Sequence, residues 1–190
     1  MSKPNAAARA PAIETTPADL EGLGAVAAAW RVGGRDFLPY RVTLLAKLLD
    51  RCTTRLLQAS SGLSVAEWRV LAQLAPTSPM SVRQLAEQAW VDRAEVSRAA
   101  ASLERRGLLE RRENEKDRRS PLLYCTPKGS ELFRRVHPSR QQFHRSLTDL
   151  LSPEQAAALE AAMLTLAKQC VQELEGAPAD PEPAPPRRRC

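Results

Sequence analysis

Arginine and short polar side chains gather in two neighbouring stretches near the middle of this 190-residue chain. The first stretch holds Arg93, Ser97 and Arg98, which helical spacing would place near one exposed face. The second is the charged run 113–120, which contains an Asp-Arg-Arg triplet. Side chains on a helix can read base edges in the major groove of DNA, and an arginine on a projecting turn can enter the narrow minor groove. These residue types therefore favour recognition of double-stranded DNA.

Two short helices are expected to position the first stretch. Capping boxes begin at Ser81 and at Asp92, and they predict helices over 81–89 and 92–106. Two helices joined by so tight a turn are typical of a helix-turn-helix. The amides that begin the first helix are expected to hold a DNA phosphate. The side chains expected to assist them are those of Ser81, Arg83 and Gln84.

A β-hairpin is expected directly after the helix-turn-helix. The strand-like runs 108–112 and 121–125 flank the charged run, so the charged residues would form the turn of a wing. The charges within 104–119 are mixed, with seven basic and five acidic residues, and a single arginine-rich turn is usually just a solvated face. The prediction of DNA binding therefore depends on the combination of helix pair, hairpin and arginines.

Long amphipathic helices are expected on both sides of this central part. A helix over about 40–59 carries an apolar stripe, and a last helix beginning at Ser152 carries a second one. Such stripes need another chain or each other to cover them, so we expect a homodimer. A twofold dimer would hold two recognition helices about 34 Å apart on a pseudo-palindromic operator. The first stripe consists of Leu45, Leu48, Leu49, Cys52 and Leu56.

The expected fold is mainly α with a small β-hairpin wing, a winged helix-turn-helix with a helical dimerisation region. Proline-rich composition at both ends predicts disorder there. The expected divisions are a disordered N-terminal arm over 1–19, dimerisation helices over 20–63, the DNA-binding domain over 64–126, dimerisation helices over 127–175, and a disordered Pro/Arg tail over 176–190.

Composition and motifs exclude several classes of protein. The net charge of +6 and the pI near 9.5 favour an anionic partner. We expect no membrane span and no secretory signal, because no apolar run is long enough. The four cysteines have no metal-like spacing, so we expect no metal or cofactor and a cytoplasmic location. An enzyme is not expected, since a Gly-rich phosphate loop, HExxH and GxSxG are all absent.

Residues from about 40 to 174 resemble the MarR family of winged-helix repressors. The resemblance is carried by Ser97-Arg98, by the run from Leu103 to Arg111, by Asp117-Arg118-Arg119, and by Thr126-Pro127-Lys128-Gly129. It implies an obligate dimer that represses by covering a palindromic operator and is released by a small, often aromatic and anionic effector. It also implies that Arg119 inserts into the minor groove, with Arg118 beside it, and that Asp117 orients an arginine.

An effector pocket is expected between the dimerisation helices and the winged domain. An aromatic acid needs an apolar slot, a flat partner and a cation. A packing role for the tryptophan and structural roles for both histidines are the alternatives. The chain looks most similar to family members that control the breakdown of nicotinate or other aromatic acids. The candidate effector residues are Asp36, Tyr40, Arg41, Trp68, His137 and His144.

Two other functions stay open at this point. A redox-responsive regulator would switch through Cys52 or Cys125, although the place of Cys52 on the leucine stripe favours buried packing. A non-specific architectural DNA-binding protein would bind without preferring one palindrome.

Overall fold

The computed structural model describes residues 16–32, 37–89, 91–115, 117 and 120–176. The chain divides into two units, Met1–Val136 and His137–Cys190, and each is described by itself. The elements in chain order are a 3-10 helix Ala18–Leu20, α1 Val26–Trp30, α2 Leu38–Ser61, α3 Val65–Thr77, β1 Met80–Ser81, α4 Val82–Ala89, α5 Arg93–Arg105, β2 Leu109–Arg112, β3 Leu122–Cys125, α6 Pro127–Thr148 and α7 Pro153–Gly176.

The described residues are mainly helical and include one small antiparallel sheet, which confirms the expected fold class. The strand order is β1-β3-β2, so β3 is the central strand. Leu109 pairs with Cys125, and Arg112 pairs with Leu122, which makes β2 and β3 the expected hairpin. The pairing of β1 with β3 was not predicted, because a strand of two residues is too short to show a periodic pattern.

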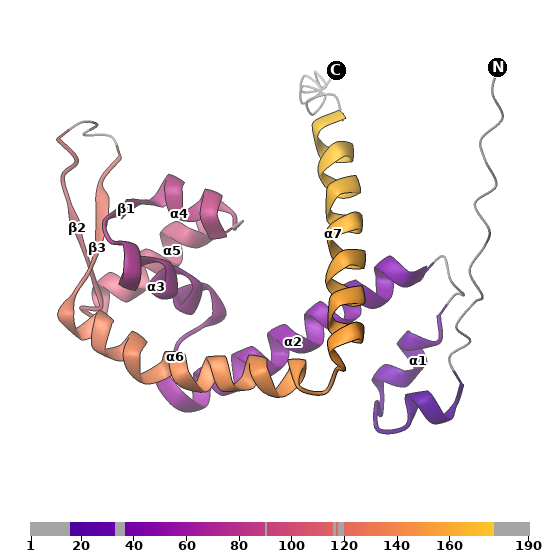
Figure 1. Cartoon of the computed structure of the whole chain (residues 1–190). Coiled ribbons are helices and arrows are strands. Elements are labelled where there is room, and N and C mark those ends of the chain that lie inside the picture. Colours follow the sequence, from indigo (N-terminus) through magenta and orange to yellow (C-terminus); the bar gives the residue numbers. More distant parts are fainter. Residues whose placement is uncertain (1–15, 33–36, 90, 116, 118–119, 177–190) are drawn as a thin grey trace, which may run out of the picture. The chain divides into compact units, whose positions relative to one another are not determined.

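Helices α3, α4 and α5 pack together within the first unit, and the hairpin of β2 and β3 extends beyond them (Figure 1). One face of α5 points inward, since Val96, Ala99, Ala100 and Leu103 are all buried. Leu71 and Leu74 of α3, Leu85 of α4 and Leu123 of β3 are fully buried in the same core. The inner face of α5 is therefore fixed by packing, and its outer face is left for polar residues.

Helical structure near the start of the segment 20–63, where dimerisation helices were expected, is interrupted by two glycines. Gly22 and Gly24 adopt φ values of 85° and 52°, in the left-handed region, and they separate the 3-10 helix from α1. Glycine reaches this region without steric cost, so a pair of glycines ends one helical segment before the next begins.

The ion pair of Glu67 with Arg106 connects the start of α3 to the ends of α5 and α2. The Glu67 carboxylate accepts a hydrogen bond from the Ser64 amide at 2.7 Å, and its own amide donates to Ser64 Oγ at 3.1 Å, which completes a capping box. Glu67 Oε1 also lies 3.7 Å from a guanidinium nitrogen of Arg106, just after α5. The same guanidinium donates to the carbonyls of Ser61 and Gly62 at the end of α2.

The start of α6 is fastened to the turn between α5 and β2. The Thr126 hydroxyl donates to the carbonyls of Gly107 and Leu108, and it accepts from the Gly129 amide at 3.1 Å. Lys128 Nζ donates to the Arg106 carbonyl at 2.8 Å. A Cβ on Gly129 would lie 2.2 Å from the Leu108 carbonyl oxygen. Only glycine therefore fits where the start of α6 meets the turn before β2.

We predict that Gly129→Ala lowers the free energy of unfolding by about 1–3 kcal/mol, the usual cost of overpacking. Urea denaturation followed by circular dichroism measures the change. Gly176→Ala is the matched control, because a Cβ there meets nothing within 4 Å. Equal stability of the two variants would contradict the close approach at Gly129.

A second prediction concerns pH. Burial raises the pKa of Glu67, but hydrogen bonds from Ser102 and Ser64 and the charge of Arg106 outweigh it, so the pKa falls below its ordinary 4.5. A lowered pKa stabilises the fold above pH 4.5, and the stabilisation is lost as the pH falls through the folded-state value. Glu67→Gln should therefore cost about 1–3 kcal/mol at pH 7 and progressively less below pH 4.5.

Denaturation of both proteins at several pH values measures this difference. Glu160→Gln, at an exposed position of α7, is the control and should change little. A destabilisation by Glu67→Gln that stays constant from pH 7 to well below 4.5 would argue against the role of the charge.

Candidate nucleic-acid interface

The outer face of α5 is polar and open. Asp92 Oδ1 accepts from the amides of Ala94 and Glu95 at 2.8 and 3.2 Å, and this cap starts the helix where the sequence indicated. Arg93, Ser97 and Arg98 are all exposed. The first turns of α5 thus present two guanidinium groups and a hydroxyl, which are donors suited to base edges and phosphates.

At the start of α4, two of the three side chains expected to assist in holding a DNA phosphate bind each other instead. Ser81 is buried, and its amide and hydroxyl both donate to Gln84 Oε1, at 2.8 and 3.0 Å. The Gln84 amide donates back to Ser81 Oγ at 3.2 Å. Ser81 and Gln84 therefore form a reciprocal cap, and the exposed cation of this helix start is Arg83.

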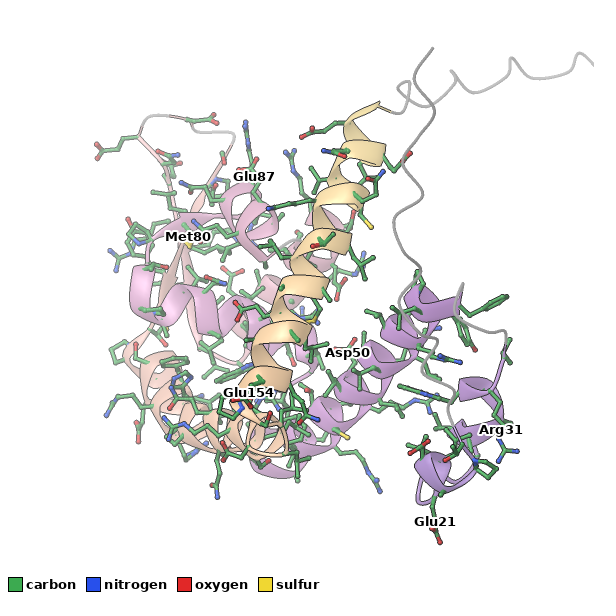
Figure 2. The ribbon with its side chains drawn as sticks, turned by 45° about the vertical axis from the view of Figure 1, so that its right-hand side comes forward. Glu21, Arg31, Asp50, Met80, Glu87 and Glu154 are labelled. Atoms are coloured by element: carbon green, nitrogen blue, oxygen red, sulfur yellow. The ribbon has the colours of Figure 1, made fainter. Side chains whose placement is uncertain are left out.

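Glu87 was missed by the sequence reasoning and connects the two helices. Its Oε1 accepts from Arg83 Nε at 2.8 Å and lies 3.9 Å from a terminal nitrogen of Arg93. The hydrogen bond and charge of Glu87 raise the pKa of Arg83. Figure 2 shows Glu87 on α4, on the side toward which the hairpin extends. One carboxylate thus offsets two candidate DNA-binding cations from successive helices. The signal for it is the i,i+4 spacing with Arg83.

The hairpin carries further arginines that are already engaged. Arg111 Nε lies 3.4 Å from Glu104 of α5, which ties the hairpin to that helix. Arg112 pairs with Glu110, and its guanidinium carbon lies 4.5 Å from the centre of the Tyr124 ring. Both guanidinium groups already engage other side chains, so they are poorly placed as free cations for DNA.

The turn of the hairpin is described in part. The Asp117 amide donates to the Asn114 carbonyl, the Ser120 amide donates to the Asp117 carbonyl, and Asn114 Nδ2 donates to the Ser120 carbonyl at 3.2 Å. Asp117 is exposed. Arg118 and Arg119, predicted to contact the minor groove, lie outside the described residues.

The candidate effector residues are spread over the chain. Trp68 is buried and stacks on Phe133 with ring centres 5.7 Å apart, so it belongs to the core, as its alternative interpretation held. Tyr40 is exposed, and Arg41 Nε donates to the Trp30 carbonyl at 3.1 Å. Asp36 lies outside the described residues.

The two candidate histidines belong to the second unit. His144 Nε2 lies 3.3 Å from a guanidinium nitrogen of Arg140, and its ring meets that of Phe143 edge-on. Burial lowers the pKa of this arginine. His137 is half-buried, one turn before Arg140 on the same helix.

The cysteines differ from one another in exposure. Cys52 is exposed in the single chain, so the expectation of buried packing is wrong for this state of the molecule. Cys125 is half-buried, and its Sγ lies 3.5 Å from Ser130 Oγ. Within the described part of the chain, no group of three or more His, Cys, Asp or Glu residues is placed to hold a metal ion.

Comparison with known proteins supports the winged-helix interpretation. A sequence model of the MarR family matches residues 61–120, which run from the end of α2 into the hairpin turn. The transcriptional repressor MprA of Escherichia coli K12 is 29% identical over 139 residues, covering 69% of this chain and 79% of MprA. The structure of Sco3205, a MarR family regulator from Streptomyces coelicolor in complex with DNA, matches with 29% identity and a TM-score of 0.64, covering 70% of this chain and 85% of Sco3205.

The chain is thus similar to MarR family regulators over about 70% of its length. It is accordingly a winged-helix DNA-binding transcriptional regulator and not an enzyme. A further similar fold is that of Bordetella bronchiseptica BpsR, studied for regulation of its DNA binding by 6-hydroxynicotinic acid. It matches with 24% identity and a TM-score of 0.57, covering 67% of this chain and 98% of BpsR.

Among the described residues, no helix is both long enough and apolar enough to cross a membrane. Even the 24-residue helix α7 carries charged residues at intervals along its length.

We predict that Glu87→Gln tightens binding to duplex DNA by about two- to fivefold. An exposed ion pair is worth about 0.2–1 kcal/mol, and its loss frees Arg83 and Arg93 for phosphates. Fluorescence anisotropy with a labelled duplex measures the change. Glu160→Gln is the charge-matched control in α7 and should leave the affinity nearly unchanged. Unchanged or weaker binding by Glu87→Gln would show that the two arginines do not meet DNA.

Proposed function

We propose that this chain is a dimeric repressor that covers a pseudo-palindromic operator and leaves it when a small aromatic acid binds. The observation that carries the proposal is the open polar face of α5, beside the exposed arginine of α4 and the projecting hairpin. This arrangement presents one helix to a major groove and one hairpin to the adjacent minor groove.

Each candidate residue has a distinct role in this proposal. Ser97 and Arg98 read base edges, because they lie on the outer face of α5 opposite its buried residues. Arg83 and Arg93 hold phosphates once DNA competes with Glu87 for them. The reciprocal cap of Ser81 and Gln84 fixes the start of α4. At the hairpin tip, Arg118 and Arg119 enter the minor groove, and Asp117 orients them.

Exposed apolar faces support the dimer. In the first unit, α2 exposes six large apolar side chains. In the second unit, α7 spans 24 residues with none buried. Apolar surface of this extent on two long helices is typical of an interface between protein chains. The exposed side chains are Leu38, Tyr40, Val42, Leu45, Leu49 and Leu56 on α2, and Leu159, Met163, Leu164, Leu166, Val171 and Leu174 on α7.

An aromatic acid, such as a catabolite of the nicotinate pathway or a related one, is the effector in this proposal. Tyr40 is exposed near the start of α2, and Arg41 follows it with a guanidinium group that a carboxylate could recruit. Asp36, His137 and His144 remain candidates from the sequence, whereas Trp68 is held in the core. In BpsR, a protein of the same fold, an aromatic acid of this kind regulates DNA binding.

The proposal is tested with the full chain and the DNA upstream of its own coding region. Sedimentation should show a dimer at micromolar concentration, and the specific fragment should bind about 10³-fold more tightly than random duplex. A panel of aromatic acids should include one that releases the DNA and raises the melting temperature. A monomer without preference for any fragment would overturn the proposal, and equal binding to all duplexes would favour an architectural protein.

We predict that Ser97→Ala and Arg98→Ala reduce the preference for the operator over random DNA by about 5- to 100-fold per contact, because base contacts are worth about 1–3 kcal/mol.

Arg119→Ala should weaken operator binding and flatten its dependence on salt, since a cation close to the phosphates is lost. Anisotropy titrations at several salt concentrations separate the two effects. A uniform loss of affinity for all sequences in Ser97→Ala and Arg98→Ala would argue against base reading.

A further inference from the structure

A cavity of about 550 Å³ lies in the first unit, and none of the candidate effector residues lines it. It lies where the end of α2, the end of α5 and the start of α6 meet, and its volume falls within the range of small-molecule sites. Its lining residues come from three segments of the chain. They are Ser61, Arg105, Arg106, Leu108, Lys128, Glu131, Leu132 and Arg135.

Four of these residues are cations and one is a carboxylate. Arg106 is paired with Glu67 and holds the carbonyls that end α2, and Lys128 donates to the Arg106 carbonyl. Arg105 and Arg135 are exposed and form no ion pair with an acid among the described residues. With Glu131 offsetting one charge, the cavity keeps a surplus of about two positive charges.

Two apolar side chains complete the wall. Leu108 and Leu132 are 3% and 7% exposed, so they are held firmly in the core while contributing to the cavity surface. A wall of two leucines beside several cations suits a molecule with methylene groups between negatively charged ends.

The cavity lies away from the proposed DNA-reading surface. It includes the C-terminal end of α5, and a helix of 13 residues separates that end from Arg93 by about 20 Å. It also lies at the base of the hairpin, where Leu108 precedes β2, and not at the hairpin turn. A small molecule therefore suits the cavity better than a DNA phosphate.

We propose that this cavity is a binding site for a small organic dianion, separate from the aromatic-acid site. The two negative groups engage Arg105 and Arg135, and the methylenes between them lie on Leu108 and Leu132. Such a ligand joins the end of α5 to the start of α6. Any effect on operator affinity rests on the proposed function, whereas the binding itself does not.

Isothermal titration calorimetry of the full chain without DNA tests the site, so that a failure to bind DNA does not affect the result. The probes are glutarate, a dicarboxylate with three methylenes, and inorganic phosphate, both at constant ionic strength. We expect glutarate to bind more tightly than phosphate because of the leucines. Arg105→Gln and Arg135→Gln should each weaken glutarate binding by about tenfold, the usual effect of one charge-assisted hydrogen bond.

Two further variants serve as controls. Arg134→Gln removes the same charge from the neighbouring exposed position outside the cavity, and it should change the affinity by less than about twofold. Glu131→Gln removes the carboxylate of the cavity and should tighten binding. Tighter binding of phosphate with the same dependence on both arginines would keep the site and assign it to phosphorylated molecules. Absence of binding by both probes at about 10 mM, or an equal loss in Arg134→Gln, would overturn the proposal.

Discussion

The side chain of Arg106 is the contact on which the first unit depends most. Its guanidinium holds the carbonyls at the end of α2 and faces the Glu67 carboxylate at the start of α3, while its own carbonyl accepts from Lys128 of α6. Four helices therefore meet at one residue that directly follows the recognition helix. Because Glu67 is buried, removing its charged partner would leave an uncompensated carboxylate, so this junction resists rearrangement. The direction in which α5 presents its outer face follows from it.

Acidic side chains neutralise more of the positive charge of the winged part than the net charge of +6 suggests. Arg83 and Arg93 share Glu87, and Arg111 of the hairpin faces Glu104 of α5. A surface whose arginines are partly neutralised attracts all DNA less strongly, so shape and base contacts contribute a larger share of binding. This balance suits a regulator that must distinguish one operator from many competing sites better than it suits an architectural protein.

The long helices serve a different purpose from the winged part. Neither the exposed leucines of α2 nor those of α7 contribute to the core around α3, α4 and α5. Hydrogen bonds of Thr126, Lys128 and Gly129 hold the start of α6 against the winged part, and the proposed dianion site lies beside them. A ligand that stiffens this junction would act on the element that connects α5 with the helices available for dimerisation.

Local signals in the sequence determined the helices, their caps, the hairpin and the buried face of α5, because periodicity and capping depend on residues within a few positions of each other. The candidate base-reading residues follow from the same periodicity. Only the tertiary structure decided the partners of Glu67, the engagement of Arg83 and Arg93 by Glu87, the pairing of β1 with β3, and the cavity lined by Arg105 and Arg135. These features join residues far apart in the chain, or in different elements, and their distances are set by how the core packs rather than by any local spacing.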